Sequence, residues 1–155
     1  MNHYRFSVHV SFSHSEDIVM VAACADESVG VDVERITRYP EKVANRMFST
    51  AELRRLNRFD GVERDIEFFR VWTLKEAISK AWGLGMAMHF PQITVSRDAL
   101  GWSTGCSWWT VSNGSLIASV AKVSAIQHQP KPTWYSLATV TAHMLHSETW
   151  RRMTS

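Results

Sequence analysis

The longest regular pattern in this chain of 155 residues lies at residues 63–83, which read ERDIEFFRVWTLKEAISKAWG. Apolar side chains recur in it at spacings of three and four, at Val71, Leu74, Ile78, Ala81 and Trp82. This period is typical of an amphipathic helix that turns one face to a core. We expect the helix to end at Gly83 or Gly85, because glycine commonly terminates helices.

The chain before this helix carries the patterns of strands. Residues 4–12 alternate apolar and polar side chains, which predicts a half-buried strand. Residues 18–25 are continuously apolar, as in a strand covered on both faces, and a third strand is predicted at residues 29–34. Three strands in succession indicate an antiparallel meander.

Between these strands and the long helix, the spacing of apolar residues changes to that of helices. The change begins at Pro40 and continues to Ser49, which stands three residues before Glu52. A serine and a glutamate at this distance form a capping box. A second short helix is therefore predicted from Thr50 to about Phe59.

After the long helix the chain returns to strand patterns, at residues 92–96, 108–112, 116–121 and 134–141. The pair Asn113-Gly114 favours a type I′ turn, so a hairpin is predicted between the two middle strands. Strands, a helical insert and more strands indicate one α+β domain over residues 1–155, built on an antiparallel sheet.

The bulk composition excludes several classes of protein. Hydrophobic residues make up 45% and charged residues 21%, which is typical of globular proteins. A net charge of +2 from scattered charges does not indicate a nucleic-acid surface. Two cysteines favour a reducing compartment, and no apolar run reaches the length of a signal peptide core or a membrane span. We therefore expect a soluble, cytoplasmic protein.

The predicted strand VGVDVE at residues 29–34 places two carboxylates on one face. Gly30, Asp32 and Glu34 alternate with valines, so the three share a side. The two negative charges repel unless a cation lies near them. The alternative is a solvated strand face. Gly30 favours the ligand interpretation slightly, because glycine leaves room for a ligand to approach the backbone.

The long helix offers a third carboxylate and an ammonium group. Trp72, Glu76 and Lys80 are spaced four apart and form a stripe beside the apolar one. Alone, Glu76 and Lys80 are more simply an ordinary surface pair. Together with the acidic strand they suit Mg²⁺, which binds a few carboxylates and the phosphate oxygens of a substrate.

The segment Ser13-His14-Ser15 follows the first predicted strand. Its hydroxyls, amides and imidazole could contact a phosphate. A serine-rich turn without a ligand is at least as good an interpretation of this segment in isolation.

Four motifs in this order resemble the 4′-phosphopantetheinyl transferases, specifically the second half of the larger, surfactin-synthetase-activating type. They are FSHS at 12–15, VGVDVE at 29–34, FSTAE at 48–52 and WTLKEAISKAWG at 72–83. The resemblance implies transfer of the 4′-phosphopantetheine group of coenzyme A to a serine of an acyl- or peptidyl-carrier protein. Such carriers serve fatty acid, polyketide or nonribosomal peptide biosynthesis.

The resemblance also implies roles for individual residues. Magnesium ligands would be Asp32, Glu34 and Glu76, and Glu76 would also be the general base. Contacts to coenzyme A would come from Ser13, His14, Lys75 and Lys80, with Lys80 also counted as catalytic.

The resemblance covers only one of the two halves of the larger type. The chain would then pair with itself, need another polypeptide that replaces the first half, or act as a non-catalytic, coenzyme A-binding homologue. The aromatic residues considered for self-pairing are Trp102, Trp108, Trp109 and Trp134; the alternative is that they fill the core.

Two further interpretations carry less weight. An acidic carrier protein could dock on Arg46, Arg54, Arg55 and Arg58, although a solvated helix face explains them slightly better. His143 and His146 are spaced like helical metal ligands, but no nearby cysteine or carboxylate completes a zinc set.

Overall fold

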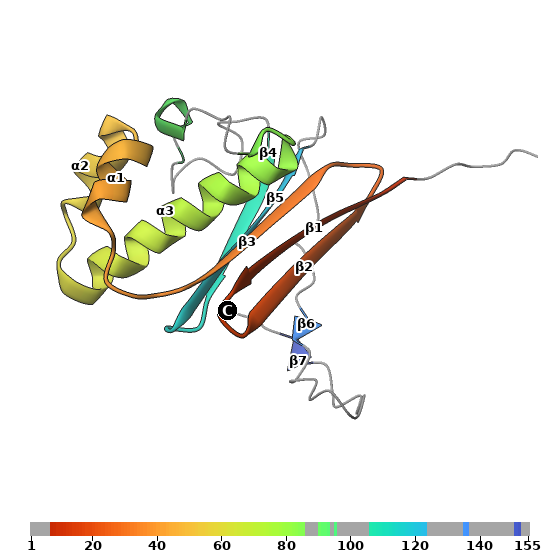
Figure 1. Cartoon of the computed structure of the whole chain (residues 1–155), viewed down its shortest axis with the longest axis horizontal. Helices are drawn as coiled ribbons and strands as arrows, with labels where there is room; N and C mark the ends of the chain where they lie inside the picture. Colours follow the sequence, from red (N-terminus) through yellow and green to blue (C-terminus); the bar gives the residue numbers. More distant parts are fainter. Residues whose placement is uncertain are drawn as a thin grey trace, which may run out of the picture.

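Figure 1 shows the computed structural model of the chain, which describes residues 7–85, 90–93, 95, 106–123, 135–136 and 151–152. Its elements, in order, are β1 (Val8–Ser15), β2 (Ile18–Ala25), β3 (Val29–Arg35), α1 (Glu41–Met47), α2 (Thr50–Leu56), α3 (Gly61–Ala81), the 3₁₀ helix η2 (Phe90–Gln92), β4 (Cys106–Ser112), β5 (Leu116–Val123), β6 (Tyr135–Ser136) and β7 (Arg151–Arg152). All pairings between these strands are antiparallel. The α+β fold class with one long helix is confirmed.

The strands form a three-stranded sheet of order β3-β5-β4, a β1-β2 hairpin and the small pair β6-β7. The main core lies between α3 and the sheet, where Leu74 and Ile78 pack near Ile117 and Ala121 of β5. A second, smaller core lies between the sheet and the hairpin, around Val31. The sheet is therefore covered by α3 on one face and by the hairpin on the other (Figure 1).

Gly30 sets the distance between β3 and α3. A Cβ at this position would lie 2.0 Å from the Ala77 carbonyl oxygen and 2.5 Å from the Ala81 nitrogen. The absence of a side chain at Gly30 therefore allows the backbone of α3 to pack directly on β3. The interpretation that Gly30 leaves room for a ligand is wrong, because α3 fills that space.

Hydroxyl groups join β1 to the free edge of β3. The serines at alternate positions of β1 accept hydrogen bonds from backbone N–H groups of β3, at 3.1 Å for Ser11 and Val31, 3.4 Å for Ser13 and Val33, and 3.1 Å for Ser15 and Arg35. We call this row the serine ladder. It takes the place of backbone pairing between the two strands. β1 itself continues to Ser15, beyond the predicted end at residue 12, because it pairs with β2 up to that residue.

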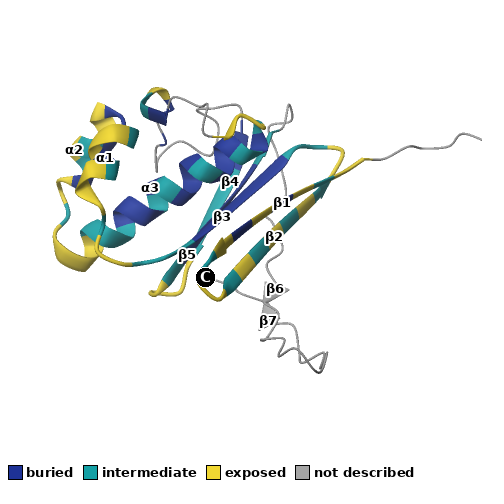
Figure 2. Cartoon of the chain, in the orientation of Figure 1, coloured by how far each residue is buried: buried dark blue, intermediate teal, exposed yellow. Residues whose placement is uncertain are grey.

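The outer face of the β1-β2 hairpin is apolar and exposed. Its five large apolar side chains are each more than half exposed, and they are Val8, Val10, Phe12, Val19 and Val21. Exposed and more buried positions alternate along both strands (Figure 2). Because strand side chains alternate, His14 lies on the same outward face as Phe12 and is also exposed.

Four local predictions need correction. The first three strands do not form a meander, because β3 pairs with β5 and not with β2. Alternate residues of β2 are exposed, so this strand is not covered on both faces. The β4-β5 hairpin is present, but Asn113 does not have the positive φ of a type I′ turn; its Oδ1 instead accepts the N–H groups of Ser115 and Leu116. The predicted strand at 92–96 is absent from its described residues: Gln92 ends η2, and Ile93 and Val95 belong to no helix or strand. The Val95 N–H donates to the Glu52 carboxylate rather than to a strand. Residues 137–141 of the last predicted strand lie outside the described residues.

Candidate active site

Asp32 and Glu34 lie side by side on the face of β3 that is turned to α3. The serine ladder orients both carboxylates, because Ser13 donates to Asp32 Oδ1 at 2.8 Å and Ser15 donates to Glu34 Oε2 at 3.1 Å. Asp32 is buried, with 5% of its surface exposed, and Glu34 is half-buried.

The polar stripe of α3 faces these two carboxylates. The Lys80 ammonium donates to Asp32 Oδ1 at 2.8 Å and to the Val31 carbonyl at 3.0 Å. The Trp72 indole donates to Glu34 Oε1 at 3.4 Å. The close packing at Gly30 thus brings the acidic strand and the helix stripe together, as the two motifs predicted when they were combined.

Burial raises the pKa of Asp32, Glu34 and Glu76, and neighbouring acidic charges reinforce the effect for the two glutamates. For Glu34 and Glu76, burial is the larger cause and the charge of Asp32 the next. For Asp32, burial outweighs the opposing influence of Lys80 and Ser13. The three carboxylates therefore share one electrostatic environment, in which an added cation would be favourable.

One atom of this cluster has no partner: Asp32 Oδ2 is buried and accepts no hydrogen bond. A buried, unpaired carboxylate oxygen is costly, and a hard cation is a suitable partner for it. Within the described residues, no three acidic, histidine or cysteine side chains are grouped closely enough to hold a metal ion. The cluster therefore suits Mg²⁺ that is also held by waters and phosphate oxygens, since this ion seldom uses an all-protein cage.

The structure does not bring every predicted coenzyme A contact to this cluster. Ser13 reaches it only through its bond to Asp32, and His14 points from the opposite face of β1. Lys75 is fully buried on another side of α3, where its ammonium lies 2.6 Å from Glu52. Of the four predicted residues, Lys80 alone places a charged group beside the acids.

Sequence reasoning missed two contacts of the site. The sequence left Ser15 open between a phosphate contact and a serine-rich turn, and it indicated no partner for Trp72, whereas both residues donate to Glu34. The predicted capping box of Ser49 and Glu52 is present. The alternation of Ser11, Ser13 and Ser15 was a usable signal, because side chains at every second position of a strand share one face.

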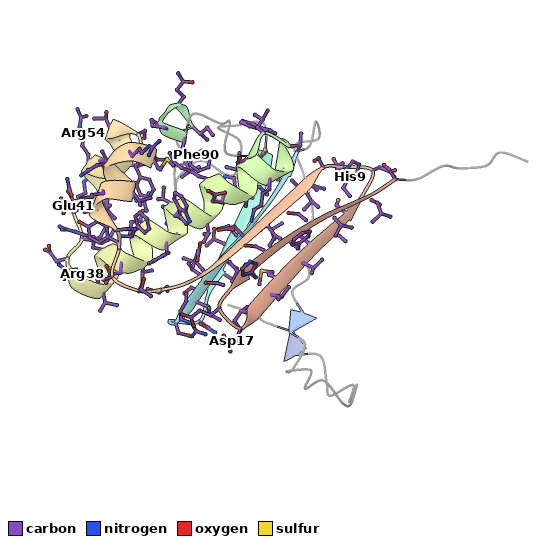
Figure 3. The ribbon with its side chains drawn as sticks, in the orientation of Figure 1. His9, Asp17, Arg38, Glu41, Arg54 and Phe90 are labelled. Atoms are coloured by element: carbon purple, nitrogen blue, oxygen red, sulfur yellow. The ribbon has the colours of Figure 1, made fainter. Side chains whose placement is uncertain are left out.

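The arginines considered for carrier docking divide into two groups. Arg55 lies 2.7 Å from Glu67 of α3, which ties it to the helix. Arg46, Arg54 and Arg58 are exposed, and Figure 3 shows Arg54 at the outer side of α2. Four of the residues considered in the sequence analysis lie outside the described residues: His143, His146, Trp102 and Trp134.

The fold and the site define an α+β domain in which an acidic strand and a lysine-bearing helix share one polar centre. The sequence pattern of the 4′-phosphopantetheinyl transferase superfamily matches residues 28–110, more than half of the chain. The chain belongs to this superfamily, and the prediction from its motifs is confirmed.

Individual relatives agree. The chain is 37% identical over 93 residues to 4′-phosphopantetheinyl transferase gsp of Aneurinibacillus migulanus, covering 60% of this chain and 39% of that protein. It is 34% identical over 98 residues to 4′-phosphopantetheinyl transferase psf-1 of Bacillus pumilus, covering 63% and 42%. The chain thus spans about two fifths of the length of these relatives.

Shorter relatives are covered more fully. The holo-[acyl-carrier-protein] synthase of Streptococcus sanguinis is 32% identical over 108 residues, which cover 59% of this chain and 89% of that protein. The crystal structure of the Thermotoga maritima holo-[acyl-carrier-protein] synthase superposes with a TM-score of 0.51 over 83% of each chain. At 17% identity this similarity shows the fold alone.

Proposed function

We propose that this protein transfers the 4′-phosphopantetheine group from coenzyme A to a serine of an acyl- or peptidyl-carrier protein, in a magnesium-dependent reaction. The observation that carries the proposal is the unpaired, buried Oδ2 of Asp32, whose carboxylate binds Lys80 and influences the pKa of Glu34 and Glu76 electrostatically. A cluster of acids that binds a metal and a diphosphate could serve several reactions. Membership of the superfamily supports phosphopantetheine transfer among them.

In the proposed reaction, the carrier serine oxygen attacks the β-phosphorus of coenzyme A. The bond from that phosphorus to the bridging oxygen breaks, and 3′,5′-adenosine bisphosphate leaves with the electron pair. A magnesium ion held by Asp32, Glu34 and Glu76 would supply charge stabilisation at the diphosphate.

Two side chains of α3 have separate tasks. Glu76 accepts the serine proton, directly or through a water, and its raised pKa makes it a better base than an exposed glutamate. Lys80, now hydrogen-bonded to Asp32, is about one-third exposed and offers its ammonium group to a phosphate.

The domain organisation and the cellular compartment also remain part of the proposal. We interpret residues 1–155 as one domain and expect a cytoplasmic protein. Among the helices that the structure describes, none is both long and apolar enough to span a membrane.

We propose a second copy of this chain as the partner that covers the outer face of the β1-β2 hairpin. The exposed side chains Val10, Phe12 and Val21 on that face are uncharged, so two copies can bury them against each other without burying a charge. Trp108 and Trp109 do not form it, because both pack partly buried against the cores.

Light scattering tests this pairing. A dimer in the wild type and a monomer in Phe12→Asp are expected, with Thr50→Asp, an exposed change on α2, as the matched control. A monomeric wild type at micromolar concentration contradicts self-pairing and favours a different chain as partner.

The second candidate is a non-catalytic or partner-dependent, coenzyme A-binding homologue. It is favoured by the position of His14, away from the acidic cluster, and by the limited coverage of the larger relatives. Titration calorimetry separates the two candidates: coenzyme A binding without turnover supports this one.

Transfer itself is tested by incubating the protein with coenzyme A, Mg²⁺ and several apo-carrier proteins, followed by mass spectrometry of the carriers. We expect a phosphopantetheine adduct with the wild type and none with Asp32→Ala or Glu76→Ala. The matched control is Asp60→Ala, an exposed carboxylate at the start of α3. No adduct on any carrier contradicts the proposal.

A further inference from the structure

Lys75 is a buried charge that the proposed reaction does not use. Its ammonium lies 2.6 Å from Glu52 Oε2 and donates to the carbonyls of Phe90 at 2.7 Å and Met47 at 3.1 Å. An ammonium group has three N–H donors, and these three acceptors occupy all of them. With its side chain 0% exposed, Lys75 has no donor left for a phosphate.

Glu52 is equally occupied. Its Oε2 accepts the backbone N–H of Ser49 at 2.7 Å and its Oε1 accepts that of Val95 at 2.8 Å. Through these bonds, Lys75 and Glu52 attach the end of α1, the start of α2 and the segment around η2 to α3. A buried pair in which all three ammonium protons and both carboxylate oxygens are hydrogen-bonded is costly to break from one side.

A line of contacts leads from this pair to the acidic cluster. Phe90, whose carbonyl Lys75 holds, lies beside α3 and turns its ring edge-on to Trp72 at 6.0 Å between centroids (Figure 3). Trp72 also stacks on Phe68 at 6.2 Å. Its indole N–H donates to Glu34 Oε1 at 3.4 Å.

We propose that Lys75 and Glu52 are a positioning pair for the metal-binding carboxylate Glu34, and that Lys75 is not a phosphate contact. The pair fixes Phe90, Phe90 restrains the Trp72 ring, and Trp72 holds one oxygen of Glu34. This inference rests on the proposed function insofar as Glu34 binds a divalent cation. Partners that orient a metal ligand typically change metal affinity by about 10- to 100-fold when removed.

The test measures Mn²⁺ binding by electron paramagnetic resonance, without coenzyme A or a carrier protein. We expect Glu52→Gln, Lys75→Met and Trp72→Phe each to raise the Mn²⁺ dissociation constant about tenfold. The double variant Lys75→Met/Glu52→Gln should resemble the single ones, because both changes interrupt the same line of contacts. Glu67→Gln, a buried acid of α3 paired with two arginines, is the matched control and should bind Mn²⁺ like the wild type.

Trp72→Phe and the electrically neutral double variant keep the test decisive if Lys75→Met alone does not fold. A second arm measures coenzyme A binding in EDTA, which all folded variants at positions 52 and 75 should retain within about twofold. Weaker coenzyme A binding by Lys75→Met, with Mn²⁺ affinity unchanged in Glu52→Gln, would overturn the inference and restore Lys75 as a phosphate contact. A wild type that binds no Mn²⁺ overturns it as well.

The inference and the proposed function can fail separately. Normal Mn²⁺ binding that responds to Glu52→Gln, together with no transfer to any carrier, supports the positioning pair and contradicts the transferase. If transfer is efficient but neither Glu52→Gln nor Lys75→Met changes the Mn²⁺ affinity, the transferase is supported and the positioning pair is contradicted.

Discussion

Helix α3 carries two lysines five positions apart, and each faces a carboxylate in a different setting. Lys75 and Glu52 have side chains 0% and 1% exposed, and all their hydrogen-bonding groups are used. Lys80 and Asp32 are 31% and 7% exposed, and Asp32 Oδ2 has no partner. Burial lowers the pKa of Lys75, opposed by Glu52, so even its charge depends on the pair.

The two pairs differ in how many hydrogen-bonding groups remain free to bind a ligand. Both are short, well-directed ion pairs, and residue type alone does not separate them. A saturated pair can only hold structure, whereas a pair with an unfilled oxygen and a partly exposed ammonium can exchange partners with a ligand. We therefore place function at Lys80 and structure at Lys75.

The largest effect is expected from Lys75→Met. It leaves the Glu52 charge buried without a counter-charge, which typically costs about 3–5 kcal/mol in the free energy of unfolding. Urea denaturation measures the loss. Lys80→Met is the comparison: because the Lys80 ammonium is 31% exposed and water can reach it, its removal should cost less than that of the fully buried Lys75. Equal losses in the two variants would remove the distinction between the pairs.

Gly30→Ala should lower the free energy of unfolding by disturbing the contact between β3 and α3 near Lys80, while the Lys75–Glu52 pair stays intact. The new methyl group meets the backbone of α3, and overpacking of this kind costs about 1–3 kcal/mol, sometimes more. Gly83→Ala is the control: it has open space around it but a φ of 68°, so it reports backbone strain alone. A Gly30→Ala protein as stable as the wild type would contradict the close approach of strand and helix.

Ser13→Ala tests how far the Ser13 hydroxyl contributes to the environment of Asp32 in the Lys80–Asp32 pair. It removes a donor to Asp32 and an acceptor for the Val33 N–H, with an expected cost of about 1–2 kcal/mol in the free energy of unfolding. The pKa of Asp32 should also rise further, because the Ser13 bond lowers it. Urea denaturation and carboxylate titration by NMR measure the two effects, with exposed Ser112→Ala as the control.

The acidic cluster should make stability depend on pH in a way that metal removes. Its acids have folded-state pKa values above the ordinary 3.8 of Asp and 4.5 of Glu, so the folded state binds more protons in the interval between ordinary and raised values. Stability must then fall as pH rises through that interval. Melting temperatures in EDTA from pH 4 upward should show this fall, and Mg²⁺ should reduce it by stabilising the charged forms. A fall that is identical in Asp32→Asn would assign it to other groups.

The sequence predicted the parts of the fold that depend on local periodicity. The long helix was expected at residues 63–83 and lies at Gly61–Ala81, and the capping box at Ser49 is present. The strand expected at 92–96 is not present in its described residues, because the Ile93 N–H donates locally to the Phe90 carbonyl and the Val95 N–H donates across the fold to Glu52. Periodicity cannot reveal such a long-range partner.

The site was predicted in outline, and its residue roles remain predictions. The spacing of Trp72, Glu76 and Lys80 placed them on one face, and the structure sets this face against the acidic strand. The burial of Lys75 was not foreseen, although a signal existed. Lys75 stands four residues after Val71 and three before Ile78, which puts it on the apolar side of the helix.

The serine ladder has a consequence for the dynamics of β3. The N–H groups of a strand alternate in direction, so those of Asp32 and Glu34 face β5 while those of Val31 and Val33 depend on hydroxyl groups of the hairpin. A hydroxyl rotates and yields to water more readily than a backbone carbonyl fixed in a sheet. Amide hydrogen exchange should therefore be faster at Val31 and Val33 than at Asp32 and Glu34, and the same openings would briefly release the carboxylates from their serines.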